Sequence, residues 1–414
     1  MLTQNQYLAL QQNIRNLKVK LELLNEFDQI VDNLEGIAIS GNINLDSSST
    51  YRRTGNITMI LDPRYNLLPN ESSKLWFNKR VGVYIGLEYI DVEWFNLGKF
   101  AIGNIQIDKS VGNQTINCEL LDYMAFLDGT LGGTLPIAVL IPAGITTISD
   151  AIKEAVKDLP RVAIDIVSID GFPADVPMDI EKPAGSTVYE LVKDLIDLYK
   201  NYEFYFDVNG FFRVQEIRQK QSDPIVWDFT ATPLSLTHNA TTEMKNIKNS
   251  IWVWGDTDDL GVQVSWRFRN RWNTDTIAER DTLIDKNTGD ICFVNETALA
   301  YYWDEDILDW ITVDFTITPS LNINNIGEKV EVLDDTNIIT LDQAKLRAKF
   351  LLMDKSNFAQ QLNFTTIPIY GLKPNSKIYL SIPDIGVEGE YLVTQISLPL
   401  GKESSNITCK KIYY

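Results

Sequence analysis

The stretch 186–215 changes from helical to strand periodicity. Thr187 and Glu190 have the spacing of a capping box at the start of a helix. Asn209-Gly210 can supply the positive φ angles of a two-residue turn between two short strands. The pattern predicts a helix followed by a β-hairpin, with no side chain suited to catalysis. The apolar residues on one helical face are Val188, Leu191, Val192, Leu195, Leu198 and Tyr199.

Alternation with a period of two dominates residues 1–135, after a short first helix. The same pattern recurs at 57–61 and 116–120, and the glycine-rich segment 129–133 before Pro136 is typical of a boundary. These residues are expected to form a first β-sheet domain, curved or barrel-like. The clearest alternating run is Val81, Val83, Ile85, Leu87 and Tyr89.

Helical periodicity returns between about 136 and 235. Thr147 is placed to cap a helix that ends before Pro160. A strand is expected at 163–167, and the proline-rich stretch 170–185 is expected to be a loop. With the stretch 186–215, these elements predict a small α+β middle module.

The remaining residues, 236–414, are again rich in strand patterns. Thr340 and Gln343 form a second capping box, which predicts a helix at about 341–354. The polar, acidic and aromatic stretch 273–325 allows no assignment. The fold class is therefore expected to be mainly β with an α+β insert: two β domains, 1–135 and 236–414, flank the module 136–235. The strands expected in the last part lie at 249–256, 264–272, 361–367, 377–382, 391–398 and 407–413.

Composition and charge argue against several classes of function. The formal net charge of −19 argues against nucleic-acid binding as the main task, because contact with phosphates needs clustered Lys and Arg. Cys118, Cys292 and Cys409 are far apart and are expected to be small buried side chains. The N-terminus lacks the pattern of a signal peptide, and no apolar run approaches the length of a membrane span.

Candidate chemistry is sparse. His238 is the single histidine and has no placed nucleophile, and the GxSxG motif is absent. Asp256, Asp258 and Asp259 do not fit a calcium loop, since Arg267 stands where the bidentate glutamate belongs. They are expected to form a solvated acidic turn, as is 285–290. We expect no catalytic residue, no metal site and no cofactor.

One row of charges is distinctive. Arg267, Arg269 and Arg271 share one face of a predicted strand, opposite aromatic residues on the other face. Binding of single-stranded nucleic acid would need the aromatic rings on the same face as the arginines, so that bases could stack while the phosphates contact the guanidinium groups. We therefore expect an apolar face against the core, and arginines that pair with carboxylates of another subunit. Reversing all three charges should then impair oligomer assembly.

Four segments, taken in order, resemble the tail hub, or baseplate hub, proteins of tailed bacteriophages and related contractile injection particles. They are residues 39–61, 94–107 with 116–133, 187–217, and 374–400. The first contains Arg52-Arg53-Thr54 between two strands, and the third is the helix and hairpin described above. The resemblance covers most of the chain except roughly 273–325.

The resemblance implies a non-enzymatic, structural protein of the virion that assembles in the host cytoplasm. Such hubs are homotrimers at the tail tip, where two tube-type domains per subunit match a sixfold tail tube. The implied partners are the tail tube or distal tail ring protein, a spike, fibre or other tip protein, and possibly the tape measure protein. DNA would pass through the lumen without specific binding, which a net charge of −19 favours.

Two alternatives remain open. A tail-associated cell-wall or glycan hydrolase would release soluble fragments from peptidoglycan. A receptor- or carbohydrate-binding adhesin, which the aromatic content of 10% permits, would bind intact cells.

Overall fold

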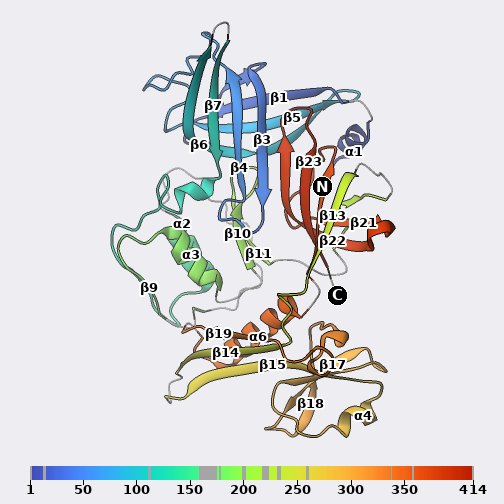
Figure 1. The fold of residues 1–414 in the computed structure, drawn as a ribbon. Coiled ribbons are helices and arrows are strands. Elements are labelled where there is room, and N and C mark those ends of the chain that lie inside the picture. Colours follow the sequence, from blue (N-terminus) through green and yellow to red (C-terminus); the bar gives the residue numbers. More distant parts are fainter. Residues whose placement is uncertain are drawn as a thin grey trace. The chain divides into compact units, whose positions relative to one another are not determined.

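The computed structural model describes residues 2–12, 15–110, 113–157, 175–176, 179–197, 202–216, 223–230, 235–257, 261–336, 338–356 and 359–412. The chain forms two compact units (Figure 1). Unit 1 comprises Met1–Ile196, Tyr202–Ala240 and Leu362–Ile412, and unit 2 comprises Asp197–Asn201, Thr241–Gln361 and Tyr413–Tyr414. Both are built mainly from antiparallel strands, which confirms the predicted mainly β fold. No helix in the described ranges is long and apolar enough to cross a membrane.

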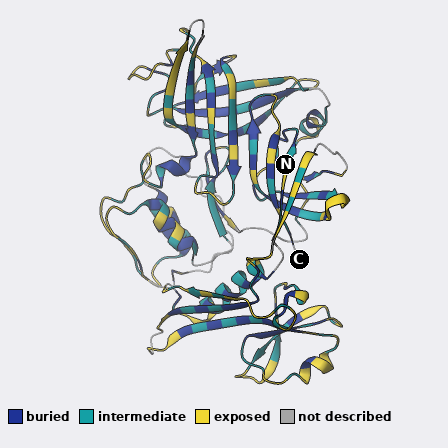
Figure 2. Ribbon diagram, viewed as in Figure 1, coloured by how far each residue is buried: buried dark blue, intermediate teal, exposed yellow. Residues whose placement is uncertain are grey.

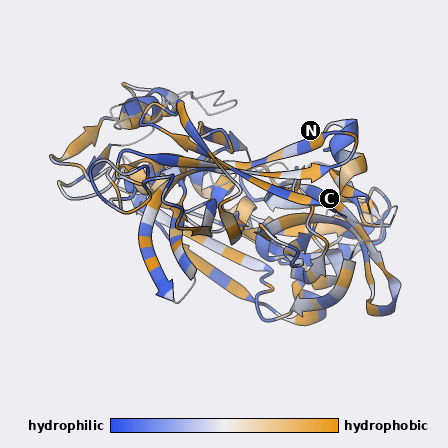
Figure 3. Cartoon of the chain, turned by 90° about the horizontal axis from the view of Figure 1, so that it is seen from above, coloured by the Kyte–Doolittle hydropathy of each residue, from blue (hydrophilic) through white to orange (hydrophobic). Residues whose placement is uncertain are grey.

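The N-terminal half of the unit 1 sheet is an antiparallel array in the order β3-β4-β7-β6-β5-β1-β2. Burial alternates along β4, where Ile57 and Met59 are buried and Asn56 and Ile60 are exposed, whereas most residues of β5 are buried. Figure 3 shows hydropathy changing from residue to residue along several strands of the chain. Helix α1 (Gln4–Leu10) begins at a capping box of Thr3 and Gln6. The strands are β1 (Leu17–Leu24), β2 (Ile30–Glu35), β3 (Ala38–Asp46), β4 (Arg53–Ile60), β5 (Arg80–Glu88), β6 (Val92–Ser110) and β7 (Asn113–Leu121).

The C-terminal half of the same sheet joins it through β22, which pairs antiparallel with β3. Leu398 lies opposite Ile43, so strands about 350 residues apart in sequence are direct neighbours. The sheet continues from β22 to β23, β20 and β13. These strands are β12 (Trp227–Asp228), β13 (Ser235–Glu243), β20 (Ala359–Thr366), β21 (Lys377–Ile382), β22 (Val387–Pro399) and β23 (Ser405–Lys411).

This grouping differs from the three segments drawn from the sequence. The strands after residue 361 belong with the N-terminal strands, whereas residues 241–361 form most of a separate unit. Hydrophobic alternation shows which face of a strand is buried, but it does not specify which distant strand lies beside it. The pairing of β3 with β22 was therefore not visible in the pattern.

One hydrophobic core serves both halves of the unit 1 sheet. Ile43, Ile57 and Cys118 from the N-terminal half belong to the same buried cluster as Ile396 and Cys409 from the C-terminal half. Figure 2 shows the buried positions repeating along these strands. The prediction that all three cysteines are buried is confirmed, and none forms a disulfide.

The helix and hairpin predicted at 186–215 are present in unit 1. The Thr187 hydroxyl oxygen accepts a hydrogen bond from the Glu190 N–H (3.2 Å), and Glu190 Oε2 accepts one from the Thr187 N–H (2.9 Å). The capping box is thereby confirmed. Leu198, Tyr199 and the strand predicted at 163–167 lie outside the described residues. The module contains β8 (Val139–Ile141), α2 (Ile148–Lys157), β9 (Ile180–Lys182), α3 (Val188–Asp197), β10 (Tyr202–Phe206) and β11 (Phe212–Glu216), preceded by the 3-10 helix η1 (Tyr123–Phe126).

The predicted two-residue turn at Asn209-Gly210 is wrong. The Asp207 N–H donates to the Phe211 carbonyl oxygen (2.8 Å), so three residues, 208–210, connect the strands. Among these three loop residues, Gly210 alone has a positive φ, of 81°. Asp207 Oδ1 accepts hydrogen bonds from the N–H groups of Asn209 (2.9 Å) and Phe211 (3.1 Å), which favours the longer loop.

Gly210→Ala should destabilise unit 1 more than Gly144→Ala does. Both glycines have positive φ, 81° and 67°, a conformation that costs an L-residue about 1–2 kcal/mol. A Cβ at Gly210 would also lie 2.7 Å from the Tyr123 ring, whereas none of the described atoms lies within 4 Å of a Cβ at Gly144. Urea unfolding of the two variants measures the difference. Equal losses would contradict the close approach of the hairpin to Tyr123.

Unit 2 contains a six-stranded sheet in the order β18-β17-β16-β15-β14-β19. Helix α6 (Leu341–Lys355) contributes Ala344, Ala348 and Leu352 to its core, and the Thr340–Gln343 capping box is present as predicted. The unassigned stretch 273–325 contains three strands, two short α-helices and the 3-10 helix η2 (Pro319–Leu321). The elements are β14 (Ser250–Thr257), β15 (Gln263–Thr274), α4 (Ile277–Asp281), β16 (Asp290–Val294), β17 (Leu299–Asp304), β18 (Asp309–Thr312), α5 (Ile323–Ile326) and β19 (Val330–Asp334).

Candidate functional site

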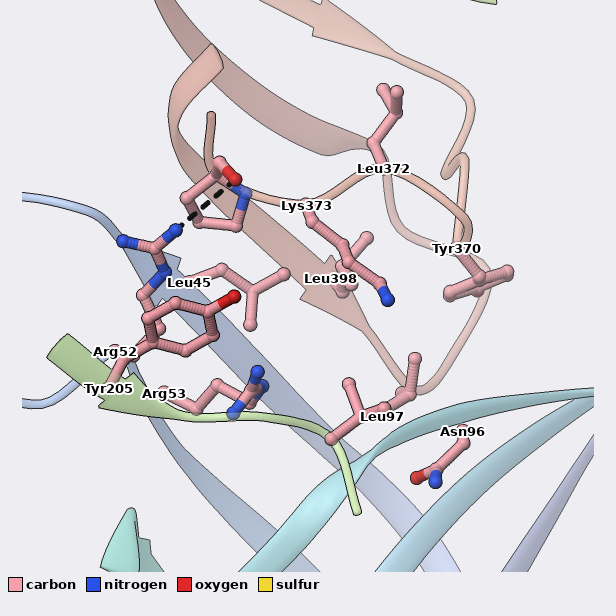
Figure 4. Close-up of a pocket in the computed structure, with 12 residues that line it drawn as sticks. Leu45, Arg52, Arg53, Asn96, Leu97, Tyr205, Tyr370, Leu372, Lys373 and Leu398 are labelled. Carbon is pink, nitrogen blue, oxygen red and sulfur yellow. Dashed lines mark hydrogen bonds between the residues drawn. The ribbon is translucent and has the colours of Figure 1, made fainter. Parts of the chain in front are cut away.

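Two adjacent arginines at the start of β4 are buried in unit 1. Arg52 and Arg53 are each 6% exposed. Arg52 Nη1 forms an ion pair with Glu203 Oε2 of β10 at 2.8 Å, and its guanidinium lies over the Tyr205 ring, 4.6 Å from the centroid. Its other terminal nitrogen donates to the carbonyl oxygen of Pro374 (3.3 Å), the contact drawn in Figure 4. Arg52 thus connects β4 to the hairpin and to the loop before β21.

Arg53 connects β4 to two other segments. Its Nη1 donates to the Phe206 carbonyl oxygen (2.6 Å) and lies 3.7 Å from Asp122 Oδ2. Asp122 is 2% exposed and caps η1 by accepting a hydrogen bond from the Met124 N–H (3.0 Å). We call Arg52, Arg53, Asp122 and Glu203 the arginine junction. It fastens the helix-hairpin module to the sheet by buried, charge-assisted contacts.

A second buried ion cluster lies beside this junction. Asp28 Oδ1 is 2.7 Å from Arg80 Nη1 and accepts a hydrogen bond from the Tyr123 hydroxyl at 2.7 Å. Lys99 Nζ is 3.2 Å from the other oxygen of Asp28. Asp28 has a positive φ of 59°, a strained conformation that these contacts hold in place.

Burial changes the acidity of the junction. Desolvation raises the pKa of Asp122 to about 6, although the positive charge of Arg53 acts in the opposite direction. Desolvation also lowers the pKa of Arg53. Each charge is costly in this apolar setting without its partner, so the pair stabilises only when both members are present.

The raised pKa of Asp122 predicts a pH dependence of stability. The folded protein retains the Asp122 proton between the ordinary pKa of 3.8 and about 6, so stability from this group is lost as pH rises through that window. The loss should reach roughly 3 kcal/mol, at about 1.4 kcal/mol per pKa unit. Urea unfolding of wild type and Asp122→Asn at pH 4.5 and pH 7.5 measures it: the wild type should lose more stability. Identical changes in both proteins would contradict the raised pKa.

A small pocket adjoins the junction. It has a volume of about 50 Å³ and is lined by residues of the sheet, the hairpin and the loop before β21 (Figure 4). Sites for drug-sized ligands span roughly 300–1,000 Å³. The pocket is therefore too small for a substrate of that size. The charged groups of the arginine junction hold chain segments in position, so their role is structural.

The predicted arginine row lies on β15 of unit 2, with Trp266, Phe268 and Trp272 buried. Arg269 Nε and Arg271 Nη1 contact the two oxygens of Asp290 at 2.6 and 2.7 Å. Arg267 donates to the Thr288 carbonyl oxygen (3.0 Å) and lies over the Trp252 ring, 5.0 Å from its centroid. Two of the three arginines therefore already have a carboxylate partner within their own chain.

The solvated acidic turn predicted at 285–290 is wrong for Asp290, which is fully buried. The sequence pattern missed this because the partners, Arg269 and Arg271, lie about 20 residues earlier, on the neighbouring parallel strand β15. Asp256 is exposed near the end of β14, whereas Asp258 and Asp259 lie outside the described residues.

His238 lies on β13, with its ring stacked on Phe364 at a centroid distance of 6.3 Å. Within the described ranges, no group of three or more His, Cys, Asp or Glu side chains is placed to hold a metal ion.

Sequence comparison provides no relatives: no protein-family model matches the chain, and a search of characterised proteins finds no match. Structural comparison finds similar proteins. The fold is similar to the tail protein from Neisseria meningitidis MC58, with a TM-score of 0.60 and 11% identity over 95% of this chain and 97% of that one.

Two further solved structures are similar over the same extent. The 43 kDa tail protein of prophage MuSo2 from Shewanella oneidensis has a TM-score of 0.56 and 11% identity, over 95% of this chain and 98% of that one. Prophage tail protein gp18 from Listeria monocytogenes EGD-e has a TM-score of 0.54 and 9% identity, over 95% of this chain and 94% of that one. The fold of this chain is therefore similar to that of these three tail proteins.

Proposed function

We propose that this protein is a structural hub of a phage-type tail, which forms a trimeric ring at the tail tip and joins the tail tube to the tip proteins. The observation that carries the proposal is the extent of the structural likeness. Three tail proteins share the fold over 94–98% of their own length and 95% of this chain. A likeness confined to one domain would have been compatible with many unrelated functions.

The two halves of the unit 1 sheet support the symmetry of the proposed ring. Each half is a strand array, and the β3–β22 pairing fixes one beside the other within a single core. We infer that the halves are the two tube-type domains of the hub. Three subunits would then present six such arrays to a sixfold tail tube.

The charge of the chain favours the proposed passage of DNA. A net charge of −19 disfavours adhesion of phosphate backbones to the lumen. We propose a location in the virion, with the tail tube or distal tail ring protein on one side and a spike, fibre or other tip protein on the other. The tape measure protein is a further proposed partner.

We also propose that the role is non-enzymatic. The buried charges of the arginine junction are engaged in structural pairs, and the adjoining pocket of about 50 Å³ is small for a substrate. Incubation with purified peptidoglycan should release no soluble fragments. Their release would support the hydrolase alternative instead.

The subunit-interface proposal now centres on Arg267. Unlike Arg269 and Arg271, it forms no ion pair with a described residue. Arg267→Glu should weaken the oligomer in sedimentation, because a carboxylate of a neighbouring subunit would then be repelled. An unchanged oligomer would contradict this interface. Reversal of all three charges is a poorer test, since it would also break the pairs with Asp290.

Labelling intact particles tests the proposed location. Antibody raised against this protein, coupled to gold, should mark the end of the tail distal to the head in electron micrographs. Labelling along the tube or at the head would contradict a hub at the tip.

A further inference from the structure

The pocket beside the arginine junction is lined by a lysine that forms no ion pair with a described residue. Arg52 pairs with Glu203, Arg53 lies near Asp122, and Asp207 pairs with Arg213 at 2.8 Å. Lys373 also lines the pocket. Its ammonium has no ion-pair or hydrogen-bond partner among the residues that the structure describes.

Hydrogen-bond donors are also available on Arg53. Its guanidinium donates one hydrogen bond within the described chain, to the Phe206 carbonyl oxygen. A guanidinium has five N–H donors, so others remain for a ligand. Figure 4 shows the charged ends of Arg53 and Lys373 directed into the space beside Leu97 and Leu398.

The surroundings favour a negative ligand. Lys373 as a residue is exposed, yet desolvation of its ammonium lowers its pKa, and the positive charge of Arg53 lowers it further. The negative charge of Asp207 acts in the opposite direction, but Asp207 is already paired with Arg213. Desolvation likewise lowers the pKa of Arg53. An anion between these groups would offset the cost of both charges. Leucine walls would strengthen the attraction, because they lower the local dielectric constant.

We propose that this pocket binds a small oxyanion of the class of inorganic phosphate, held between Arg53 and Lys373. A volume of about 50 Å³ suits such an ion and is too small for a nucleotide. The ligand would connect the start of β4 to the loop before β21, close to the β3–β22 pairing that joins the two sheet halves. By mass action it would stabilise unit 1. The proposal goes beyond the hub function and does not depend on it.

Titration calorimetry of the full chain with sodium phosphate tests the proposal, with ionic strength held constant by sodium chloride. We expect saturable binding of one phosphate per chain. Lys373→Gln should weaken it at least tenfold, while Lys373→Arg, which keeps the charge, should retain it. The matched control is Lys109→Gln, because Lys109 is exposed at the end of β6, outside the pocket, and should not affect binding.

No saturable binding by the wild type would overturn the proposal, as would equal affinity in wild type and Lys373→Gln. Equal weakening by Lys109→Gln and Lys373→Gln would show general charge attraction and would also overturn it. If Lys373→Gln does not fold, hydrogen exchange of the wild type decides. Residues 370–376 must exchange more slowly in phosphate than in chloride, and an unchanged rate contradicts the site.

Discussion

Replacing Arg53 by Met is expected to lower the free energy of unfolding of unit 1 by about 3–5 kcal/mol, the usual cost of removing one partner of a buried ion pair. The substitution leaves Asp122, which is 2% exposed, without its counter-charge. It also removes the donor to the Phe206 carbonyl oxygen at the end of β10. The helix-hairpin module should therefore loosen from the sheet before the sheet itself unfolds.

Urea unfolding measures the loss, and hydrogen exchange should locate it at the hairpin and at η1. Arg64→Met is the matched control, since Arg64 pairs with Asp62 at 2.5 Å but its side chain is 77% exposed. An exposed pair of this kind contributes little to stability, so the control should unfold at the wild-type urea concentration. Equal behaviour of the two variants would contradict a structural role for the arginine junction.

Asp290→Asn should destabilise unit 2 by about 3–5 kcal/mol, because it removes the carboxylate shared by Arg269 and Arg271. The change preserves the shape of the side chain, so the effect reports the charge. Asp290 Oδ2 also accepts a hydrogen bond from the Asn287 N–H (3.1 Å), which holds the turn before β16. Both the strand pairing and the turn depend on this residue.

Tryptophan fluorescence can follow the unfolding of unit 2, because Trp266 and Trp272 lie on β15 beside the arginines. Asp306→Asn is the control, since Asp306 is exposed in the β17–β18 turn and should unfold as the wild type does. A wild-type unfolding curve for Asp290→Asn would show that the arginines find other partners. The arginine row would then again be available to another subunit.

Local features of the fold could be predicted from the sequence, and long-range ones could not. Capping boxes and helical periodicity located α3 and α6, because both signals lie within a few residues of each other. The pairing of β3 with β22 and the burial of Asp290 depend on segments brought together only by folding. The prediction of a two-residue hairpin turn was wrong for a local reason: the side chain of Asp207 accepts a hydrogen bond from the Phe211 N–H, which favours the three-residue loop.

The arginine junction shows the same limit. Arg52-Arg53 stood out only as part of a family resemblance, because a pair of arginines after a polar loop is ordinarily exposed. Their partners, Glu203 and Asp122, lie about 150 and 70 residues away. The arginine row was placed correctly on a strand with its aromatic face buried, and its proposed pairing with another subunit stays a prediction.

The central claim is a trimeric hub at the tail tip, and a cryo-electron microscopy reconstruction of the particle's tail tip tests it most directly. The account predicts three copies of this chain in one ring, with the two halves of each unit 1 sheet alternating around a sixfold tail tube. Six copies in a ring would contradict it and would indicate a different tail ring, such as a distal tail adaptor.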